Sequence, residues 1–472
     1  MLPDDVLLQI FYFFVDKTSE FPKNEIEKWQ TLVHVCRRWR RVVFGSPRRL
    51  NLRLVCTPET PARDTLDVWP SLPLLIRDSY HKTEDVDNII AVLKRSDRVV
   101  KIRLYNIVVS GLENVLATMG VPFPELTRLS LSLQDGMVSV LPDSFLGGSA
   151  PRLESLSLIR IPFPGLPKLL LSATHLVELT LADIPHSGYI SPKEMVTALS
   201  TLPRLDYLSL QFGSPQSRPD RHPPPLTRSV LHVLISFQFK GVCEYLEDIM
   251  ARIDAPRLKI LEITLFNQII FDTPQFIQFI GRTPMLERFE KALVVFGYNI
   301  ARVILLSQTS GYGKLNVQIP CIELDWQVSS MEQICTSGLP PFSSLEDLYI
   351  YENRHSRQVW QDNIENALLL ELLQPFTTVK NLYLSEKTAS CIMPALQELV
   401  GGRTTEVLPI LQNIFLEELQ PSGTVQACIQ QFIATRQVTS QPIAVSRWDN
   451  SKEDMNRMIL YNDTHLVSNL IS

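Results

Sequence analysis

The sequence predicts an α/β fold in which an all-helical N-terminal segment precedes a long array of strand–helix repeats. A short apolar phrase recurs about a dozen times between residues 99 and 420, and apolar residues at helical spacing lie between the copies. Residues 1–49 lack the phrase and have a helical pattern instead. Stacked repeats of this kind place a parallel sheet on the concave face and helices on the convex face.

The recurring phrase has the form L-x-x-L-x-L, often preceded by proline. Clear copies begin at Pro124, Pro151, Thr174, Pro203, Pro256, Ser343, Thr377 and Pro409, and weaker copies at Asp97, Ser229, Pro284 and Ile319. The distances between the first apolar positions of successive copies run from 23 to 34 residues. Most of these distances are within or near the period of about 20 to 29 residues that is typical of leucine-rich repeats.

The phrase has a direct physical interpretation. Its last two apolar residues alternate with polar ones, so they point to one side of a short strand. The proline cannot donate to a sheet and marks where the preceding helix stops. A doubly wound α/β domain is the alternative, but its strands are usually continuous apolar runs that are buried on both faces. The alternation and the spacing favour the repeat array.

The pattern divides the chain into four parts. Residues 1–49 form the helical segment, 50–98 a linker with a first irregular repeat, and 99–420 the repeat array. Residues 421–472 are expected to close the array with a helix as far as Arg436, followed by a loose tail from about Asn450. The proline-rich residues 213–225 predict an exposed loop between repeats.

Composition limits the classes of function. The formal net charge of −5 gives no case for nucleic-acid binding. No window has the run of about 18 apolar residues that would cross a bilayer, and the acidic start Met1–Asp5 is unlike a signal peptide. Seven scattered cysteines without a C-x-x-C pair indicate a reducing compartment. We therefore expect no membrane and a location in the cytoplasm, the nucleus or both.

The N-terminal segment carries more apolar surface than two helices can bury between them. Leu7, Ile10, Phe11 and Phe14 are spaced to form one helix face, and a second helix is expected over residues 26–44. An apolar excess of this kind predicts a surface for a partner protein. The alternative is a helical cap that buries the same residues on the first repeat.

At these residues the chain resembles a known family. LPDDVLLQIF (residues 2–11) and LVHVCRRWRRV (residues 32–42) are similar to the two halves of the F-box motif, and residues 45–76 resemble the expanded fungal F-box family with leucine-rich-like repeats. The resemblance implies binding to a Skp-type adaptor and, through it, to a cullin–RING ubiquitin ligase. It places the adaptor contacts at Leu2, Pro3, Leu7, Ile10, Phe11, Val35, Cys36 and Trp39, with residues 17–28 as an inserted loop.

No catalytic constellation accompanies this motif. Phosphate-binding, dinucleotide-binding, zinc-protease and nucleophile-elbow motifs are absent, and the eight histidines lack metal-ligand spacing. We therefore expect no cofactor, no metal and no enzymatic activity. The arginines at positions 37, 38, 40 and 41 predict a solvated basic helix face, which could also steer the chain toward an acidic adaptor.

The polar positions of the strands predict where a client protein binds. In the later repeats these positions become acidic and aromatic, which suits a basic client; they are Glu323, Asp325, Asp347, Tyr349, Tyr351, Tyr383 and Phe415. Ordinary exposed strand residues are the alternative. The function expected from the whole is the substrate-recognition subunit of a Skp–cullin–F-box ligase, and the alternatives are a non-catalytic binding scaffold and an unrecognised enzyme.

Overall fold

The computed structural model describes residues 2–15, 28–59, 66, 68–78, 86–105, 108–133, 140–215, 227–266, 271–307, 313–340, 342–352, 364–399, 406–417, 423–438 and 442–448. These residues divide into two compact units, one ending at Tyr189 and one beginning at Ile190. Each unit is described by itself. The predicted tail after Asn450, most of the predicted insertion at residues 17–28 and most of the loop at 213–225 lie outside the described residues.

The first unit begins with three helices, namely α1 (Asp4–Phe14), α2 (Lys28–Val35) and α3 (Arg37–Gly45). The elements that follow are β1 (Leu54–Cys56), β2 (Leu74–Arg77), α5 (Asp87–Leu93), β3 (Val99–Leu104), α6 (Val109–Thr118), β4 (Arg128–Ser132), η1 (Phe145–Gly148), β5 (Ser155–Ile159), α7 (Leu166–Leu170), β6 (Glu178–Ile184) and η2 (His186–Gly188). Strands β1 and β2 lie in residues 50–98, the segment expected to hold a linker and a first, irregular repeat, so the sheet begins there.

The strands of this unit pair in sequence order, and each pair is parallel. The register aligns equivalent positions of the phrase, so that Leu129 pairs with Leu156 and Leu156 with Leu179. All three leucines are at most 1% exposed. Burying a leucine side chain is worth roughly 1.5 to 3 kcal/mol, so the aligned leucines account for a large part of the stability of the sheet.

The single helix predicted over residues 26–44 is wrong, because the chain breaks it at Cys36. This residue has an extended backbone (φ −160°, ψ 168°) and is the N-cap of α3, where its Sγ accepts a hydrogen bond from the Trp39 amide at 3.5 Å. The side chain satisfies one of the donors that a helix start leaves free. The N-terminal segment is therefore a three-helix arrangement.

The second unit comprises α8 (Pro192–Leu199), β7 (Tyr207–Phe212), β8 (Ser229–Val230), β9 (Ser236–Gly241), α9 (Cys243–Arg252), β10 (Ile253–Asp254), β11 (Ile260–Leu265), α10 (Pro274–Gly281), η3 (Pro284–Leu286), β12 (Lys291–Phe296), β13 (Ile300–Ser307), β14 (Gly313–Pro320), α11 (Leu324–Gln333), η4 (Ile334–Gly338), β15 (Asp347–Glu352), α12 (Asn366–Leu373), β16 (Asn381–Leu384), α13 (Glu386–Gln397), β17 (Asn413–Leu416), α14 (Gly423–Val438) and β18 (Ala444–Arg447). The predicted closing helix corresponds to α14, which extends two residues beyond Arg436.

One stretch of this unit departs from the repeat. The strand order is β7-β9-β11-β14-β13-β12-β15-β16-β17-β18, and β13 is antiparallel to both of its neighbours. The weak copies of the phrase at Pro284 and Ile319 lie on either side of this reversal, and neither forms a repeat strand. Pro320 ends β14, and the apolar spacing after it belongs to the start of α11.

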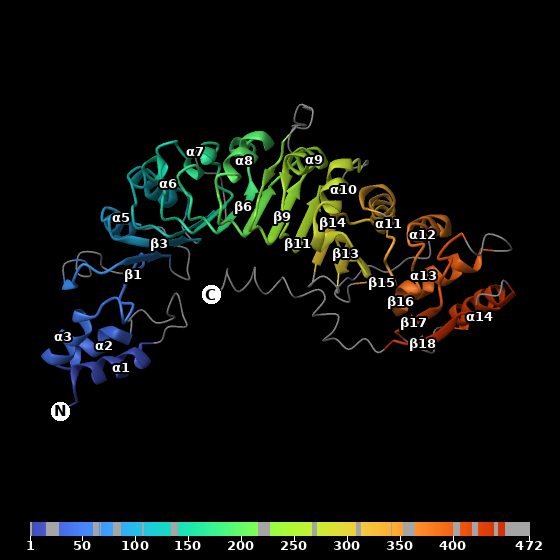
Figure 1. Cartoon of the computed structure of the whole chain (residues 1–472), viewed down its shortest axis with the longest axis horizontal. Coiled ribbons are helices and arrows are strands. Elements are labelled where there is room, and N and C mark those ends of the chain that lie inside the picture. The colour runs from blue at the N-terminus through green and yellow to red at the C-terminus, as the bar shows by residue number, and fades with distance from the viewer. Residues whose placement is uncertain are drawn as a thin grey trace. The chain divides into compact units, whose positions relative to one another are not determined.

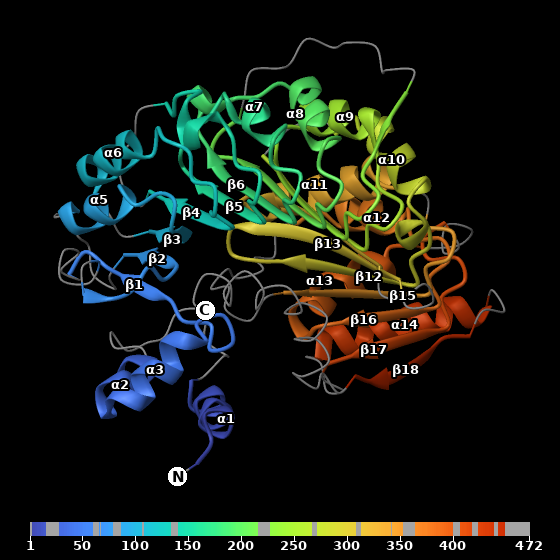
Figure 2. The same ribbon diagram turned by 60° about the vertical axis from the view of Figure 1, so that its left-hand side comes forward.

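The helices of the second unit lie on one face of its sheet. Helices α8, α9 and α10 contact one another in sequence, as do α11, α12, α13 and α14. Figures 1 and 2 show α8 to α12 along one side of the strands. We call the other side of this sheet the open face. A doubly wound domain carries helices on both faces, so among the described residues this arrangement supports the repeat array.

At the start of β14, the backbone of Gly313 lies close to the backbone of Met285. A Cβ added to Gly313 would lie 1.9 Å from the carbonyl oxygen of Met285, which is backbone and cannot rotate away. We expect Gly313→Ala to lower the free energy of unfolding by about 1 to 3 kcal/mol, as overpacking does. Gly281→Ala is the control, because a Cβ there has no neighbour within 4 Å. Urea denaturation in which both variants unfold at the same midpoint would contradict this expectation.

Candidate protein-binding surfaces

Helix α1 is apolar on two sides, and only one side is covered. Leu7, Leu8 and Phe11 are buried. A second set of apolar side chains is 39% to 75% exposed and comprises Leu2, Val6, Ile10, Phe13 and Phe14. We call this set the apolar stripe, because residues 2, 6, 10 and 13 or 14 follow one side of a helix. An exposed apolar surface of this kind is typical of interaction sites.

The inner side of α1 packs on α3. The rings of Phe11 and Trp39 have their centroids 4.7 Å apart. Arg38 donates to the Asp4 carboxylate at 2.9 Å and to the Leu2 carbonyl, which brings the start of α3 next to the start of α1. The exposed residues Val35 and Cys36 precede α3 directly, so they lie near the N-terminal end of the apolar stripe.

Trp29 attaches the helices to the chain that follows them. It is 0% exposed, and its indole N–H donates to the Arg53 carbonyl oxygen at 3.1 Å. Its ring centroid is 6.1 Å from that of Phe44 and 5.2 Å from that of Trp69, and both contacts are edge-on. The three-helix arrangement is thus packed through α2 and α3, and the apolar stripe on α1 remains exposed.

The residues predicted to contact an adaptor divide into two groups. Leu2, Pro3, Ile10, Val35 and Cys36 are exposed, whereas Leu7 and Phe11 are buried and Trp39 is half-buried. The buried residues hold the helices together. Val6 and Phe13 were not predicted, although Phe13 is the most exposed of the stripe at 75%. Their spacing from Ile10, by four and three residues, is the signal that indicates them, because residues so spaced share one side of a helix.

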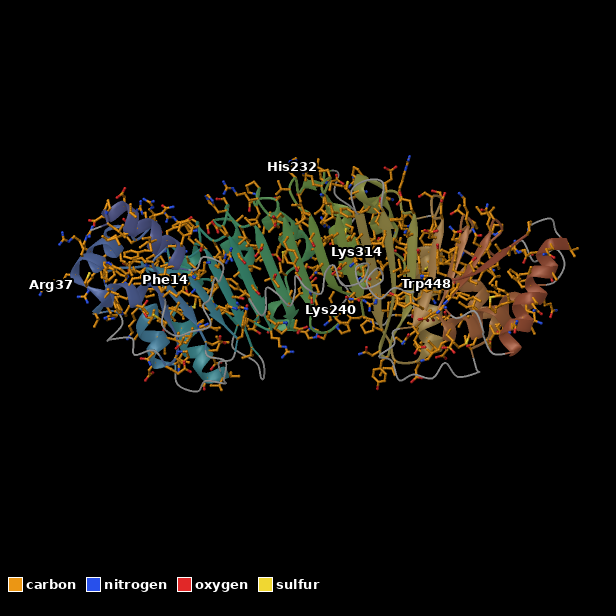
Figure 3. The ribbon with its side chains drawn as sticks, turned by 90° about the horizontal axis from the view of Figure 1, so that it is seen from below. Phe14, Arg37, His232, Lys240, Lys314 and Trp448 are labelled. Atoms are coloured by element: carbon orange, nitrogen blue, oxygen red, sulfur yellow. The ribbon has the colours of Figure 1, made fainter. Side chains whose placement is uncertain are left out.

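The basic residues of α3 also divide. Arg38 bonds to α1, and Arg40 donates to the Val33 carbonyl oxygen at 3.0 Å. Arg37, Arg40 and Arg41 are all exposed, and Figure 3 shows Arg37 at the surface of the helical segment. Three exposed arginines therefore accompany the apolar surface, and of these Arg40 is held by its bond to Val33.

The open face of the second unit carries a stack of aromatic rings. Tyr349 and Tyr383 stack with centroids 4.1 Å apart, and Tyr383 and Phe415 at 4.5 Å. Trp448 meets both tyrosines edge-on at 5.7 Å, and Figure 3 shows it lying over the strands. The strand register aligns these side chains, since Tyr349 pairs with Tyr383 and Tyr383 with Phe415. Tyr351 follows on the same side of β15, as alternation along a strand requires.

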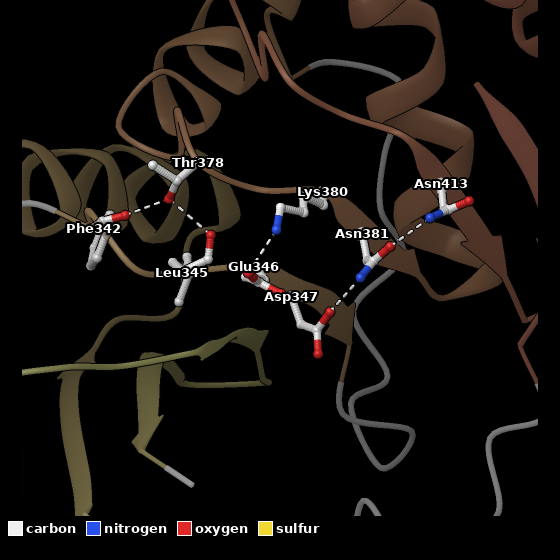
Figure 4. A network of polar contacts seen from close by, with 8 residues as sticks. All are labelled: Phe342, Leu345, Glu346, Asp347, Thr378, Lys380, Asn381 and Asn413. Atoms are coloured by element: carbon white, nitrogen blue, oxygen red, sulfur yellow. Dashed lines mark hydrogen bonds and ion pairs between the residues drawn. The ribbon is translucent and has the colours of Figure 1, made fainter. Parts of the chain in front are cut away.

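A row of polar side chains runs beside this stack. Asn381 donates to the Asp347 carboxylate at 2.7 Å, and Asn413 donates to the Asn381 amide oxygen at 2.8 Å (Figure 4). The Lys291 Nζ lies 3.8 Å from a carboxylate oxygen of Asp347 and forms an ion pair with it. Tyr349 and Tyr351 are each only 7% exposed, and burial is the main cause that raises the pKa of both phenols above its ordinary value. The structure thus brings together five of the seven residues predicted to bind a client.

The other two predicted client residues lie elsewhere. Glu323 is the N-cap of α11 and Asp325 is in its first turn, so the prediction that both face outward from a strand is wrong. The apolar positions of residues 319–324 imitate the phrase, but Pro320 ends the strand before the acidic residues. Both carboxylates are exposed at the start of the helix.

A polar network that was not predicted extends the open face. Tyr207 donates to Gln238 at 2.9 Å, Gln238 donates to Glu262 at 3.1 Å, and Lys314 reaches the same carboxylate at 3.3 Å. Figure 3 shows Lys314 among these strands. Gln238 and Lys314 are at most 9% exposed, and their partners come from neighbouring strands. Sequence could not reveal this network, because it depends on β11 pairing with β14.

The described residues hold no group of three or more histidine, cysteine or acidic side chains that could bind a metal. In the same part of the chain, no helix has the length and apolar character needed to span a membrane. Burial raises the pKa of Cys56 and of Cys243 to about 12, which makes these thiols unreactive at neutral pH.

The repeated strand–helix units, the aligned leucines and the helices on one face define a leucine-rich-repeat-like α/β protein, a class whose fold suggests a role in binding other proteins. The fold class predicted from the sequence is confirmed to this extent.

No protein-family model and no curated protein matches the chain. A solved structure with some likeness is that of the leucine-rich repeat-containing protein LegL7 from Legionella pneumophila. The match has a TM-score of 0.27 and 13% sequence identity, and covers 81% of this chain and 97% of that one. The fold assignment rests on the strand order and register given above.

Proposed function

We propose that this chain is the substrate-recognition subunit of a Skp–cullin–F-box ubiquitin ligase. Helices α1 to α3 bind a Skp-type adaptor, and the repeats bind a protein client. The observation that carries the proposal is the apolar stripe, which remains exposed although the helices are packed onto the chain through Trp29. The motif residues Leu2, Pro3, Ile10, Val35 and Cys36 lie at the same surface.

The proposed adaptor interface combines apolar burial with charge. Covering a leucine, isoleucine or phenylalanine side chain contributes about 1.5 to 3 kcal/mol, and the residues of the stripe together would have to exceed the cost of association, which is several kcal/mol. The exposed Arg37 and Arg41 would meet acidic groups at the rim of the interface, where charges mainly increase the association rate.

The client would lie on the open face of the second unit, over the half-buried rings of Tyr383, Phe415 and Trp448. Tyr349 is only 7% exposed, so it would support the ring of Tyr383 from its stacked position more than it would contact the client. Aromatic residues at the centre of an interface carry much of its binding energy. The chain would perform no chemistry itself. It would hold client lysines near the transferred ubiquitin and raise their effective concentration. Such ligases act in the cytoplasm and nucleus, as the cysteine usage of this chain suggests.

Adaptor binding is tested with two exposed residues, so that the fold is preserved. Ile10→Asp combined with Val35→Asp places two charges in the proposed apolar interface, and we expect pull-down of a recombinant Skp-type adaptor to weaken more than about tenfold. Val121→Asp, which changes an equally exposed residue of the same unit, should bind as wild type does. The melting temperatures of all three proteins should agree.

Retention of the adaptor by the double variant would remove the proposal. Binding of the adaptor without recruitment of a cullin, or without ubiquitin transfer to captured clients, would instead support a scaffold. The two outcomes are separated by adding the cullin and the conjugating enzymes to the same purified complex.

A further inference from the structure

A second candidate surface lies in the second unit, beside the start of α11. A pocket of about 620 Å³ is lined by Asn299, Pro320, Cys321, Ile322, Glu323 and Trp326. This volume is within the range of about 300 to 1,000 Å³ that is usual for binding pockets. Ile322 is 59% exposed and Trp326 is 52% exposed, and Tyr298, in the turn between β12 and β13, is 58% exposed.

The walls of this pocket are fixed by a buried amide. Gln327 is 0% exposed, and its Nε2 donates to the Cys321 carbonyl at 2.7 Å and to the Gly297 carbonyl at 3.0 Å. The Cys321 amide also donates to the Asn299 carbonyl at 2.9 Å. These bonds tie the β12–β13 turn to the start of α11. A pocket that is rigid before binding loses less entropy when it is occupied.

The charge beside the pocket is negative. Glu323 and Asp325 are exposed, and in the part of the chain that the structure describes neither carboxylate has an ion-pair partner. An acidic residue in the first turn of a helix interacts favourably with the helix dipole. This interaction explains Asp325, but it does not explain the exposed Glu323. The helix dipole also does not explain why two large apolar side chains, Ile322 and Trp326, are exposed beside these carboxylates.

We propose that this pocket binds a segment of a partner protein that carries one bulky apolar side chain flanked by lysine or arginine. The apolar side chain packs against Trp326 and Ile322, and the cations lie against Glu323 and Asp325. Tryptophan at a pocket is a frequent centre of binding energy, and the two carboxylates select against acidic segments. This surface is separate from the proposed client site on the open face and needs no adaptor.

The test uses a fluorescein-labelled peptide with one phenylalanine between two arginines and two lysines, measured by fluorescence anisotropy on the full chain. We expect Trp326→Ala to weaken binding about tenfold or more. Glu323→Gln with Asp325→Asn should weaken it at low salt, and added salt should reduce the difference. Ile410→Ala and Glu371→Gln change exposed residues away from the pocket and should leave binding unchanged.

Two control peptides define the chemistry, one with alanine for the phenylalanine and one with glutamates for the basic residues. Both should bind at least about tenfold more weakly than the first peptide. Equal binding by wild type and Trp326→Ala, or equal binding of the acidic peptide, would overturn the proposal. So would a dimer in sedimentation that Trp326→Ala dissociates, because the pocket would then be a contact between two copies. The assay contains no adaptor, so its result is independent of the pull-down.

Discussion

Replacing Trp29 with alanine is expected to unfold the N-terminal helices. The side chain is fully buried between Phe44 and Trp69, and removing a buried tryptophan typically costs about 3 to 5 kcal/mol. A segment of three short helices has few other contacts from which to recover that loss. Hydrogen exchange should then show fast exchange of the amides in α1 to α3, and adaptor binding should be lost with them.

A graded series separates packing from hydrogen bonding at this position. Trp29→Phe keeps much of the apolar contact but loses the bond to the Arg53 carbonyl oxygen, so we expect a cost nearer 1 to 2 kcal/mol. Thr31→Ala, at an exposed position of the same helix, should change stability by less than about 0.5 kcal/mol. If Trp29→Ala exchanges no faster than Thr31→Ala, the helices are held in another way.

The second large effect is expected at Arg436, at the end of the second unit. This side chain is 0% exposed, and its guanidinium donates to the carbonyl oxygens of Val407 at 2.9 Å, Leu408 at 3.0 Å and Pro409 at 3.4 Å. Leu408 has a positive φ of 50°, which a leucine rarely adopts. Arg436 therefore holds a strained turn directly before β17.

We expect Arg436→Met to lower the free energy of unfolding by about 2 to 4 kcal/mol. The substitution removes the desolvation cost of the guanidinium, but it leaves buried carbonyl oxygens without this donor, at roughly 1 to 3 kcal/mol each. Gln437→Met, which changes the exposed neighbour, is the control. The measurement is urea denaturation, together with amide exchange in β17 and β18. Equal midpoints for the two variants would show that other donors replace the guanidinium.

The repeats could be predicted because their pattern is local. Leucines at alternate positions determine which side of a strand is buried, and Leu129 and Leu156 lie where the phrase places them. The copy at Ser229 was assigned three residues too early. The aligned positions there are Phe237 and Phe239, which pair with Leu261 and Ile263, and phenylalanine in place of leucine hid the register.

The features that could not be predicted depend on which strands and helices pack together in the folded chain. Residues 300–307 form a mostly apolar strand, and nothing in such a run specifies that its partners are antiparallel. The same limit applies to α1, where spacing identified apolar residues but not that Phe11 packs on Trp39 while Ile10 remains exposed. Glu323 was misplaced because three apolar positions can fit the end of a strand and the start of a helix equally well.

The reversal at β13 restricts how this protein could have changed in length. Where neighbouring strands are parallel, one strand and one helix can be gained or lost together, because the next strand still runs in the same direction. A single strand could not be deleted here, since β12 and β13 are joined by three residues and parallel neighbours need a connection of about a dozen or more. A change in length at this point would therefore have to add or remove two strands together, so that the strands on either side remain parallel.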